Sequence, residues 1–349
     1  MSEIKRVGVD LAKNVIQVHG VDELGRVVVS KALARKSFTD WCARLPGGCL
    51  LAMEACTGAH HWARQLTALG LQVRLIAPQL VAPYRVQGKS GKNDANDAQA
   101  VCEAASRPHM HFVPVKTVHQ QAILGLHRLR EGFKEDRTAC INRIRALLAE
   151  FGLVAPLKPQ ALKVRLPELL EDGANELPGL LRLAIERAVG QWGQLDQDIG
   201  WCDQRIAEHA RGDERAQQAQ ALLGVGPLGA SALMATVGDF SQFKSAAQFS
   251  AWLGLTPSQH SSGGKARLGP ITKRGNVYLR MLLVQGAKSA VLVSKPRQDR
   301  LWQWVQQLKA RVGWQKAAVA LAAKNARILW AMFTRGQAFV ANHVSLKPA

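Results

Sequence analysis

Two aspartates, Asp94 and Asp97, lie three positions apart in the stretch GKNDANDAQA. This spacing places both carboxylates on one face of a helix. Helix capping is an alternative explanation for them. Asn93 or Asp94 can cap the first turn, and Asp97 would then lie near the positive end of the helix dipole.

Capping does not explain two further acids, Asp10 and Glu54, which occur where strands are predicted. Asp10 lies inside the apolar strand RVGVDL, where an apolar residue is expected unless a site requires the acid, and Glu54 ends the strand CLLAMEA. If these strands are neighbours and the helix carrying Asp94 and Asp97 packs across them, the four carboxylates form one cluster. Four carboxylates cannot stay ionised together without cations. Oxygen ligands suit Mg²⁺ or Mn²⁺, so the cluster predicts a metal site for phosphoryl transfer.

The elements that position these acids follow the order of a ribonuclease H-like fold. Strands are predicted through Asp10, from Val15 to Val21, and over RVVVSKA. The helix SFTDWCARL, the strand CLLAMEA, the helix GAHHWARQLTALG and the strand LQVRLIAP come next. Three meandering strands followed by strand, helix, strand, helix indicate an α/β domain with a mixed sheet. We predict this domain over residues 1–115.

Two long amphipathic patterns follow this domain. Apolar residues recur at helical spacing over about 117–151 and 180–209, on either side of the proline-containing stretch LVAPLKPQALKVRLP. They predict an antiparallel coiled-coil arm over residues 116–213, with helices roughly 45 to 50 Å long at ~1.5 Å per residue. A mostly helical, all-α C-terminal domain over 214–335 and a tail over 336–349 complete the predicted organisation.

A glycine motif opens the predicted C-terminal domain. Gly224, Gly226 and Gly229 in ALLGVGPLGASALMATVG satisfy G-x-G-x-x-G, but a helix rather than a strand is predicted before them, so a dinucleotide site lacks its context. The pattern is more typical of a helix-hairpin-helix element, whose backbone N–H groups bind a nucleic-acid phosphate. Gly224 and Gly226 are therefore candidate contacts, although a plain turn between helices explains the motif equally well.

A glycine-rich loop lies further along, in TPSQHSSGGKARLGPITKRGNVYLR. Its serines precede a series of basic residues suited to phosphate contacts: Lys265, Arg267, Lys273, Arg274 and Arg280. Taken alone, Ser-Ser-Gly-Gly is more typical of a flexible loop than of a nucleophile.

The composition favours a polyanionic partner. The 46 Lys and Arg residues against 26 Asp and Glu give a formal charge of +20. We find no apolar run long enough to span a membrane and no cleavable signal, so nucleic acid is favoured over a membrane. The six cysteines are scattered without any Cys-x-x-Cys pair. This argues against a zinc ribbon or a disulfide framework and fits a reducing cytoplasm.

Four histidines are weaker candidates. His109 and His111 in PHMHF could ligate a metal, but no Cys or further His lies at a useful spacing. His60 and His61 open the helix after Glu54, where they could contact DNA or only pack.

Six motifs resemble those of the DEDD transposases of insertion sequences, the family typed by insertion sequence one-hundred-and-ten that includes the Piv invertase. GVDLAKN, MEACTGAHHWA and GKNDANDAQA are similar to its three N-terminal acidic motifs. LLGVGPLGASALMATVGD, AAQFSAWLGLTPSQHSSGG and ITKRGNVYLRMLL are similar to its C-terminal motifs. The resemblance implies a RuvC-like N-terminal domain in which Asp10, Glu54, Asp94 and Asp97 bind Mg²⁺.

The resemblance also implies a C-terminal domain whose serine attacks DNA and becomes linked to it. The family's reactive serine precedes a glycine, so Ser262 is the predicted nucleophile and Ser261 the alternative. A covalent phosphoserine conserves the phosphodiester bond energy, so strands can be rejoined without an external energy source. The other implied partners are donor and target DNA, a structured noncoding bridge RNA, and further copies of the chain, as a dimer assembling into a tetramer.

The acidic cluster, the basic charge and the family resemblance together predict a DNA recombinase of the transposase class that acts at the nucleoid in the bacterial cytoplasm, and the resemblance implies that a bridge RNA guides it. One alternative is a RuvC-like junction endonuclease that uses water with the same carboxylates and leaves Ser262 structural. Another is a non-enzymatic nucleic-acid-binding protein, for which the basic charge suffices but the four acids are unnecessary. A protein–DNA link that survives denaturation separates the first alternative from the recombinase, and metal-dependent DNA breakage excludes the second.

Overall fold

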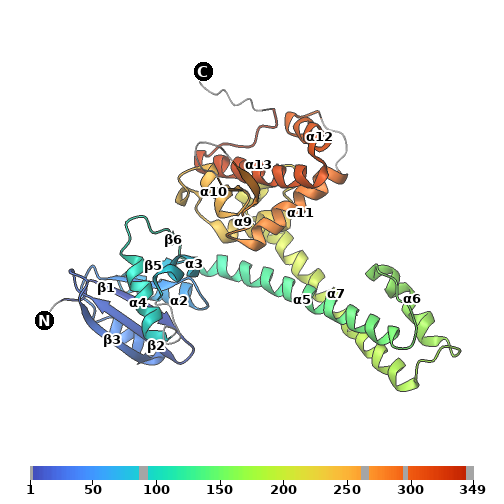
Figure 1. Cartoon of the computed structure of the whole chain (residues 1–349), viewed down its shortest axis with the longest axis horizontal. Helices are drawn as coiled ribbons and strands as arrows, with labels where there is room; N and C mark the ends of the chain where they lie inside the picture. Colours follow the sequence, from blue (N-terminus) through green and yellow to red (C-terminus); the bar gives the residue numbers. More distant parts are fainter. Residues whose placement is uncertain (1–2, 86–92, 261–266, 294–297, 343–349) are drawn as a thin grey trace. The chain divides into compact units, whose positions relative to one another are not determined.

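The chain divides into two compact units, residues 1–117 and 118–349 (Figure 1). The structure is a computed structural model, and it describes residues 3–85, 93–260, 267–293 and 298–342. The first unit contains the mixed sheet, and the second is mostly helical. The division of the second unit into an arm and a C-terminal domain stays a prediction.

The first unit is a six-stranded sheet with helices on both faces (Figure 1). Its elements in chain order are β1 (Arg6–Leu11), β2 (Val15–Val21), β3 (Val27–Ala34), η1 (Arg35–Ser37), α1 (Phe38–Cys42), β4 (Leu50–Glu54), α2 (Ala59–Ala68), β5 (Gln72–Ile76), α3 (Pro78–Val81), η2 (Ala82–Tyr84), α4 (Asp94–Ala105) and β6 (Phe112–Val113). The strand order is β3-β2-β1-β4-β5-β6. β1 is antiparallel to β2 and parallel to β4, β4 is parallel to β5, and β6 is antiparallel to β5. The ribonuclease H-like order predicted from the sequence is confirmed.

Side chains along β1 and β4 lie alternately on opposite faces of the sheet, and the two faces have different roles. Val7 and Val9 of β1 and Leu51 and Met53 of β4 are fully buried in an apolar core shared with α1 and α2. Side chains at successive positions of a strand point to opposite faces. The even-numbered positions of β1 and β4 therefore face the other side of the sheet, where α4 packs.

The packing of α4 on this second face depends on Gly8. A Cβ at position 8 would lie 2.1 Å from the Ala98 carbonyl oxygen and 2.4 Å from the Cys102 backbone nitrogen. No side chain fits in that space, so glycine allows the helix backbone to approach the strand directly. Asp10 lies two positions along β1, and its side chain therefore emerges on the face that α4 covers.

The second unit consists of helices and one short hairpin. Its elements are α5 (Val118–Ala149), α6 (Pro159–Glu171), α7 (Gly179–Gly212), α8 (Glu214–Ala219), α9 (Pro227–Val237), η3 (Phe240–Gln242), α10 (Ala246–Trp252), β7 (Pro257–Gln259), β8 (Leu268–Ile271), α11 (Val277–Val293), α12 (Arg300–Val312) and α13 (Trp314–Arg335). None of the helices in the described part of the chain is both long and apolar enough to cross a membrane.

The two long helices predicted from the apolar periodicity, α5 and α7, lie side by side (Figure 1). Arg130 pairs with Asp203 at 2.5 Å, and Arg137 pairs with Asp196 at 3.2 Å. From the first pair to the second, the arginine moves seven residues forward along α5 and its aspartate partner moves seven residues back along α7. The two helices are therefore antiparallel. The predicted pairing is confirmed.

A third helix of the arm region, α6, was not predicted, because its sequence contains prolines. Pro159 stands at the first helical position, where its missing N–H costs nothing, and Pro167 lies inside the helix. Leu162 and Leu166 of α6 are buried against α5 and α7. Tertiary burial of this apolar stripe stabilises a helix that the local sequence disfavours.

A buried polar network joins four helices of the second unit. His127 of α5 shares hydrogen bonds with the Tyr278 hydroxyl of α11 at 2.9 Å and with the Ser231 hydroxyl of α9 at 3.0 Å. His209 of α7 also shares a hydrogen bond with the Ser231 hydroxyl, at 3.0 Å. Burial lowers the pKa of His127 to about 4, so the imidazole is neutral at pH 7.

Candidate active site

Adjacent parallel strands bring Asp10 and Glu54 to the same level of the sheet. Val9 of β1 is paired with Met53 of β4. Asp10 and Glu54 are the next residues on these parallel strands, so they lie beside each other. Both residues occupy positions that face α4 rather than the apolar core under α1 and α2. This juxtaposition is the one expected from the strand order.

Asp94 and Asp97 lie in the first turn of α4, on the helix that packs against β1. The cap is supplied by Asn93, whose side-chain oxygen accepts a hydrogen bond from the Asn96 backbone N–H at 2.8 Å. Neither aspartate serves as this cap. The capping explanation therefore holds for Asn93, and both aspartates also lie in the first turn, at the positive end of the helix dipole.

The four acids are close enough to perturb one another. Burial raises the pKa of Asp10, and the negative charges of Asp97 and Asp94 raise it further. Burial also raises the pKa of Glu54, with smaller contributions from Asp10 and Asp97 in the same direction. Both shifts reflect a partly buried set of like charges that a cation would stabilise.

Arg85 contributes a positive charge to this set. It follows η2, and its guanidinium forms ion pairs with Glu54 at 2.6 Å and with Asp97 at 2.8 Å. The charge of Arg85 opposes the rise in the pKa of Glu54 more strongly than either acid supports it, and it also opposes the rise in the pKa of Asp10. Within the described residues, no three Asp, Glu, His or Cys side chains converge as ligands of one ion. In this arrangement a guanidinium bridges two of the acids where a metal ion would also be attracted.

The donor set nevertheless suits a hard divalent cation. It offers only carboxylate oxygens, which Mg²⁺ and Mn²⁺ prefer, and its members come from two strands and one helix. Glu54 and Asp97 keep only 14% and 22% of their side-chain surfaces exposed, so water neutralises their charges incompletely. The residues present therefore fit a divalent metal ion.

Ser261, Ser262 and Lys265 lie outside the described residues, so their predicted roles stay predictions. The segments on either side of them are described and form the β7–β8 hairpin. The His260 N–H donates to the Arg267 carbonyl oxygen at 2.9 Å and closes the described end of this hairpin. The sequence analysis predicted the loop but not the two strands.

The remaining basic candidates differ in how their side chains are used. Arg267, Lys273 and Arg274 are exposed, and so are accessible to a polyanion. Arg280 instead donates to the carbonyl oxygens of Leu253 at 3.0 Å and Arg274 at 3.2 Å. These bonds fix the basic turn against the end of α10. The predicted phosphate contacts of all four residues stay predictions.

Gly224 and Gly226 occupy the turn between α8 and α9, as the helix, Gly-Val-Gly, helix pattern predicted. Gly224 has a φ of 86°, and its Cβ would lie 2.9 Å from the carbonyl oxygen of Gly286 in α11. Gly224 thus has a packing role, whether or not it contacts phosphate. Gly226 immediately precedes α9, and a helix rather than a strand leads into the motif.

The four candidate histidines do not form a metal site among the described residues. The Nδ1 atom of His60 accepts a hydrogen bond from the Lys116 N–H at 3.2 Å, and the His61 ring lies 5.7 Å from the Trp62 ring. His109 and His111 are exposed. His60 therefore has a structural partner within the first unit.

Comparison with known proteins shows the family of the chain. Residues 7–152 match the DEDD_Tnp_IS110 transposase family, and residues 216–303 match the transposase IS116/IS110/IS902 family. A probable family 20 transposase of Pseudomonas aeruginosa is 46% identical over 333 residues, which cover 95% of this chain and 97% of the relative. The chain belongs to the IS110 family of DEDD transposases.

Further relatives of this IS110-family transposase agree. The transposase for insertion sequence element IS1111A of Coxiella burnetii is 42% identical over 339 residues, covering 97% of this chain and 92% of the relative. The transposase for insertion sequence element IS1328 of Yersinia enterocolitica is 39% identical over 339 residues, covering 97% of this chain and 99% of the relative. The IS110-family transposase is therefore an enzyme that binds DNA, and its DEDD domain implies catalysis with a divalent metal ion.

The sequence alone did not identify Arg85 as a partner of the acids. Nothing in its spacing distinguishes it from Lys89 and Lys92, which precede the same helix. Its role follows from the path of the chain after β5, which returns Arg85 to the carboxyl ends of β1 and β4.

Proposed function

We propose that this IS110-family transposase is an RNA-guided, site-specific recombinase that cuts and rejoins DNA with a serine nucleophile and a carboxylate-bound metal. The observation that supports the proposal is that Asp10 of β1, Glu54 of β4 and the two aspartates of the first turn of α4 lie close enough for their charges to raise one another's pKa. A protein that only bound nucleic acid would have no need of a repelling set of partly buried acids.

In this proposal the four acids hold Mg²⁺ or Mn²⁺. The sheet fixes the backbone of Asp10 and Glu54, and the first turn of α4 fixes that of Asp94 and Asp97, so binding the ion requires changes only in the side chains. A bound divalent ion supplies positive charge that stabilises a phosphate group as it reacts. Arg85 must release Glu54 and Asp97 when these carboxylates take up their metal-binding role.

Ser262 supplies the nucleophile in this proposal, with Ser261 as the alternative. The serine oxygen forms a bond to phosphorus, and the bond from that phosphorus to one deoxyribose oxygen breaks. The hydroxyl proton leaves the serine, and a proton is taken up by the departing deoxyribose oxygen. The second strand end reverses these changes by attacking the phosphoserine, so the number of phosphodiester bonds is conserved.

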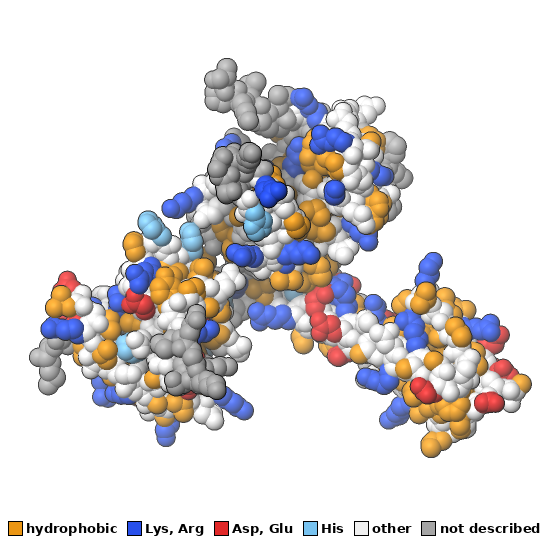
Figure 2. All heavy atoms as spheres, in the orientation of Figure 1, with side chains coloured by type: hydrophobic (Ala, Val, Ile, Leu, Met, Phe, Trp, Pro, Cys, Tyr) orange, Lys and Arg blue, Asp and Glu red, His pale blue; other side chains and the backbone are white. Residues whose placement is uncertain are grey.

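The nucleic-acid partners are supported by charge. The excess of 46 Lys and Arg over 26 Asp and Glu gives the chain a formal charge of +20, and blue basic side chains are spread over both units on the face in Figure 2. Arg267, Lys273 and Arg274 are exposed near the proposed nucleophile in the sequence. This charge suits donor and target DNA together with a structured guide RNA. The site of action in this proposal is the bacterial nucleoid.

Replacing the acids and the serine separately tests the chemistry. Asp10→Ala should abolish Mg²⁺-dependent cleavage but leave nucleic-acid binding within about threefold of wild type, because it removes a ligand and not a phosphate contact. Ser262→Ala should form no protein–DNA adduct that survives denaturation, whereas Ser261→Ala should still form one. Cleavage gels, binding titrations and denaturing gels measure these three outcomes.

Glu103→Ala is a matched control for the acids, because Glu103 is an exposed carboxylate on α4 that pairs with Arg107. It should retain cleavage and adduct formation. Cleavage by Asp10→Ala at the wild-type rate would reject the metal assignment. Metal-dependent cleavage without any adduct would instead favour a junction endonuclease that uses water.

The proposed guide RNA has its own test. The purified transposase should carry a discrete RNA. Recombination at full specificity after ribonuclease treatment would reject the proposal that RNA guides it.

A further inference from the structure

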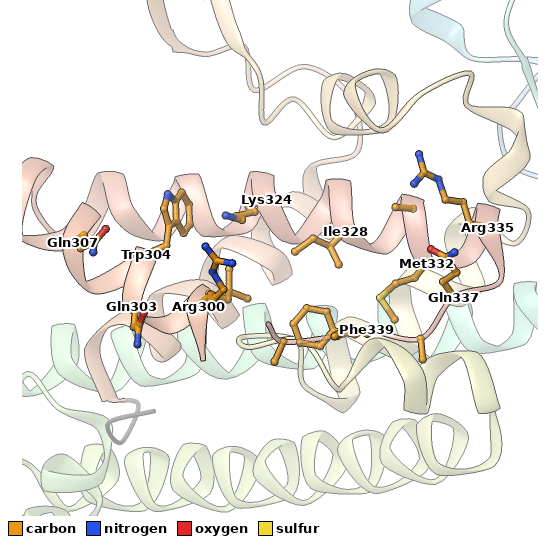
Figure 3. A pocket seen from close by; sticks show the side chains of 15 residues that line it. Arg300, Gln303, Trp304, Gln307, Lys324, Ile328, Met332, Arg335, Gln337 and Phe339 are labelled. Atoms are coloured by element: carbon orange, nitrogen blue, oxygen red, sulfur yellow. The ribbon is translucent and has the colours of Figure 1, made fainter. Parts of the chain in front are cut away.

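A large pocket lies between α12, α13 and the segment after α13, with a volume of about 1020 Å³ (Figure 3). Gly336 ends α13 in a left-handed conformation with φ 63°, and the Gln337 N–H then donates to the Met332 carbonyl oxygen at 3.1 Å. The Arg300 N–H donates to the Asn342 side chain at 3.3 Å. These bonds tie residues 337–342 to the end of α13 and the start of α12, and that segment forms one wall of the pocket.

The pocket combines apolar and amide surfaces. Ile328 and Met332 of α13 and Phe339 of the returning segment supply apolar surface, and Figure 3 shows the Phe339 ring across from Ile328. Gln303 and Gln307 line the α12 side. An aromatic ring offers a stacking surface for a base, and an amide can both donate to and accept from a base edge.

The charged residues that line the pocket are all basic: Arg300, Lys324 and Arg335. The Lys324 ammonium lies 4.0 Å from the centre of the Trp304 ring and is thereby held in place at the pocket wall. Burial lowers the pKa of Lys324, as expected for an ammonium group that has lost water. None of the described residues that line the pocket is acidic, so an anion would be attracted and would stabilise all three cations.

We propose that this pocket binds an unpaired nucleotide of the DNA, with its base against Phe339 and its phosphate beside Lys324 and Arg300. The transposase acts on DNA, and strand exchange separates strands that were paired, which makes unpaired nucleotides available. A single nucleotide presents the flat apolar face, the polar edge and the negative charge that these walls complement. A fully apolar ligand would leave the three cations without a partner.

The charge part of the proposal is tested with the full-length protein and fluorescently labelled oligothymidine. Lys324→Gln should weaken binding about fivefold, because the phosphate loses a positioned cation in a partly buried site. The matched control is Arg311→Gln, which removes an exposed cation of α12 that does not line the pocket. Arg335→Gln tests the same wall without disturbing the Trp304 ring, in case Lys324→Gln unfolds. Equal, small losses for the pocket variants and the control would overturn the proposal.

The base part is tested by comparing oligothymidine with an abasic strand of the same length. The wild type should prefer the strand with bases, and Phe339→Leu should reduce that preference about threefold while leaving the abasic strand unaffected. An unchanged preference would overturn the proposal. Oligouridine provides the third probe. Tighter binding of oligouridine than of oligothymidine, with a larger loss in Lys324→Gln, would assign the pocket to RNA and reject the DNA nucleotide.

Discussion

Arg85 makes two contacts with the acids proposed to bind metal, at 2.6 Å to Glu54 and 2.8 Å to Asp97. A guanidinium cannot lose its proton at ordinary pH, so its charge is permanent. It can therefore stabilise the acids in the absence of metal. The same charge competes with a metal ion for the same carboxylate oxygens.

Arg85→Ala should consequently have opposite effects on the metal-free and metal-binding properties of the transposase. The melting temperature without Mg²⁺ should fall, because Glu54, Asp97 and Asp10 repel one another more strongly. The Mg²⁺ concentration for half-saturation should fall about three- to tenfold, since a partly exposed ion pair no longer has to break. Thermal unfolding across a series of Mg²⁺ concentrations, together with calorimetric titration, measures both effects.

Two further variants sharpen this test. Arg85→Lys retains the charge and should stay closer to wild type than Arg85→Ala does. Arg26→Ala breaks an ion pair with Asp22 in the same unit and should leave Mg²⁺ binding unchanged. Weaker Mg²⁺ binding by Arg85→Ala would show that Arg85 assists the metal rather than competing with it.

The acids and Arg85 differ in how far sequence could predict them. Asp10 is unusual within an apolar strand, and Asp94 and Asp97 share a helical face, so their residue types and positions are informative. Arg85 is one of 46 basic residues, and its position depends on a turn through η2. Long-range placement of this kind has no local signal.

At the scale of elements, the network around His127 links α5, α9 and α11. Its imidazole is buried, and its two nitrogens share hydrogen bonds with Tyr278 and Ser231. Protonation would place a positive charge in this buried position, where little water is present to stabilise it. Protonation would therefore weaken the junction between the long helix and the helices that follow.

The pH dependence of stability follows from the lowered pKa of His127. The folded value of about 4 lies below the ordinary value of 6.5, so stability from this group is complete above pH 6.5 and is lost as pH falls towards 4. The loss is at most about 3 kcal/mol. His127→Phe should be about 1 to 3 kcal/mol less stable near pH 7, because two polar partners lose their hydrogen bonds, and should show a smaller decline towards acid.

Urea unfolding of the full-length protein at several pH values measures this difference. His111→Gln removes an exposed histidine from the first unit and should keep the wild-type decline. An identical decline in His127→Phe would mean that other groups cause the acid sensitivity. His209, whose pKa burial also lowers, would then be the next residue to replace.

Helices and strands with a strong apolar periodicity were predicted from the sequence. Strands that form only by pairing with a neighbouring strand were not. The first five strands and the two long helices follow from alternation and from helical spacing. β6 has only two residues and exists by pairing with β5, and β7 and β8 have three and four residues and pair with each other. Such short segments acquire strand structure from their neighbours rather than from intrinsic preference.

At the scale of the whole molecule, the four acids and Ser262 belong to different compact units. The acids lie between positions 10 and 97 in the first unit, and Ser262 lies in the second. Helices of 32 and 34 residues separate them along the chain. A partner protomer could therefore supply the serine that works with the acids of this one.

Mixing two inactive variants distinguishes a shared site from a site within one chain. If sites are shared, a dimer of Asp10→Ala with Ser262→Ala has one site with both defects and one with neither, so it should form a covalent DNA adduct. If each chain builds its own site, neither site is complete and no adduct can form. Co-expression with two different affinity tags isolates the mixed dimers, and denaturing gels measure the adduct. Verified mixed dimers without adduct would reject the shared site.

The contact at Gly8 has a consequence for the inheritance of the mobile element. The spacing between β1 and α4 is fixed by backbone atoms that are in contact at this glycine. Substituting a smaller side chain nearby would therefore not make room for the methyl group of an alanine at position 8. A glycine codon becomes an alanine codon by one base change. Such a copy would keep every acid and its serine, yet α4 would be displaced from β1 and the acids moved apart. Genomes can thus accumulate immobile copies whose sequence motifs look intact.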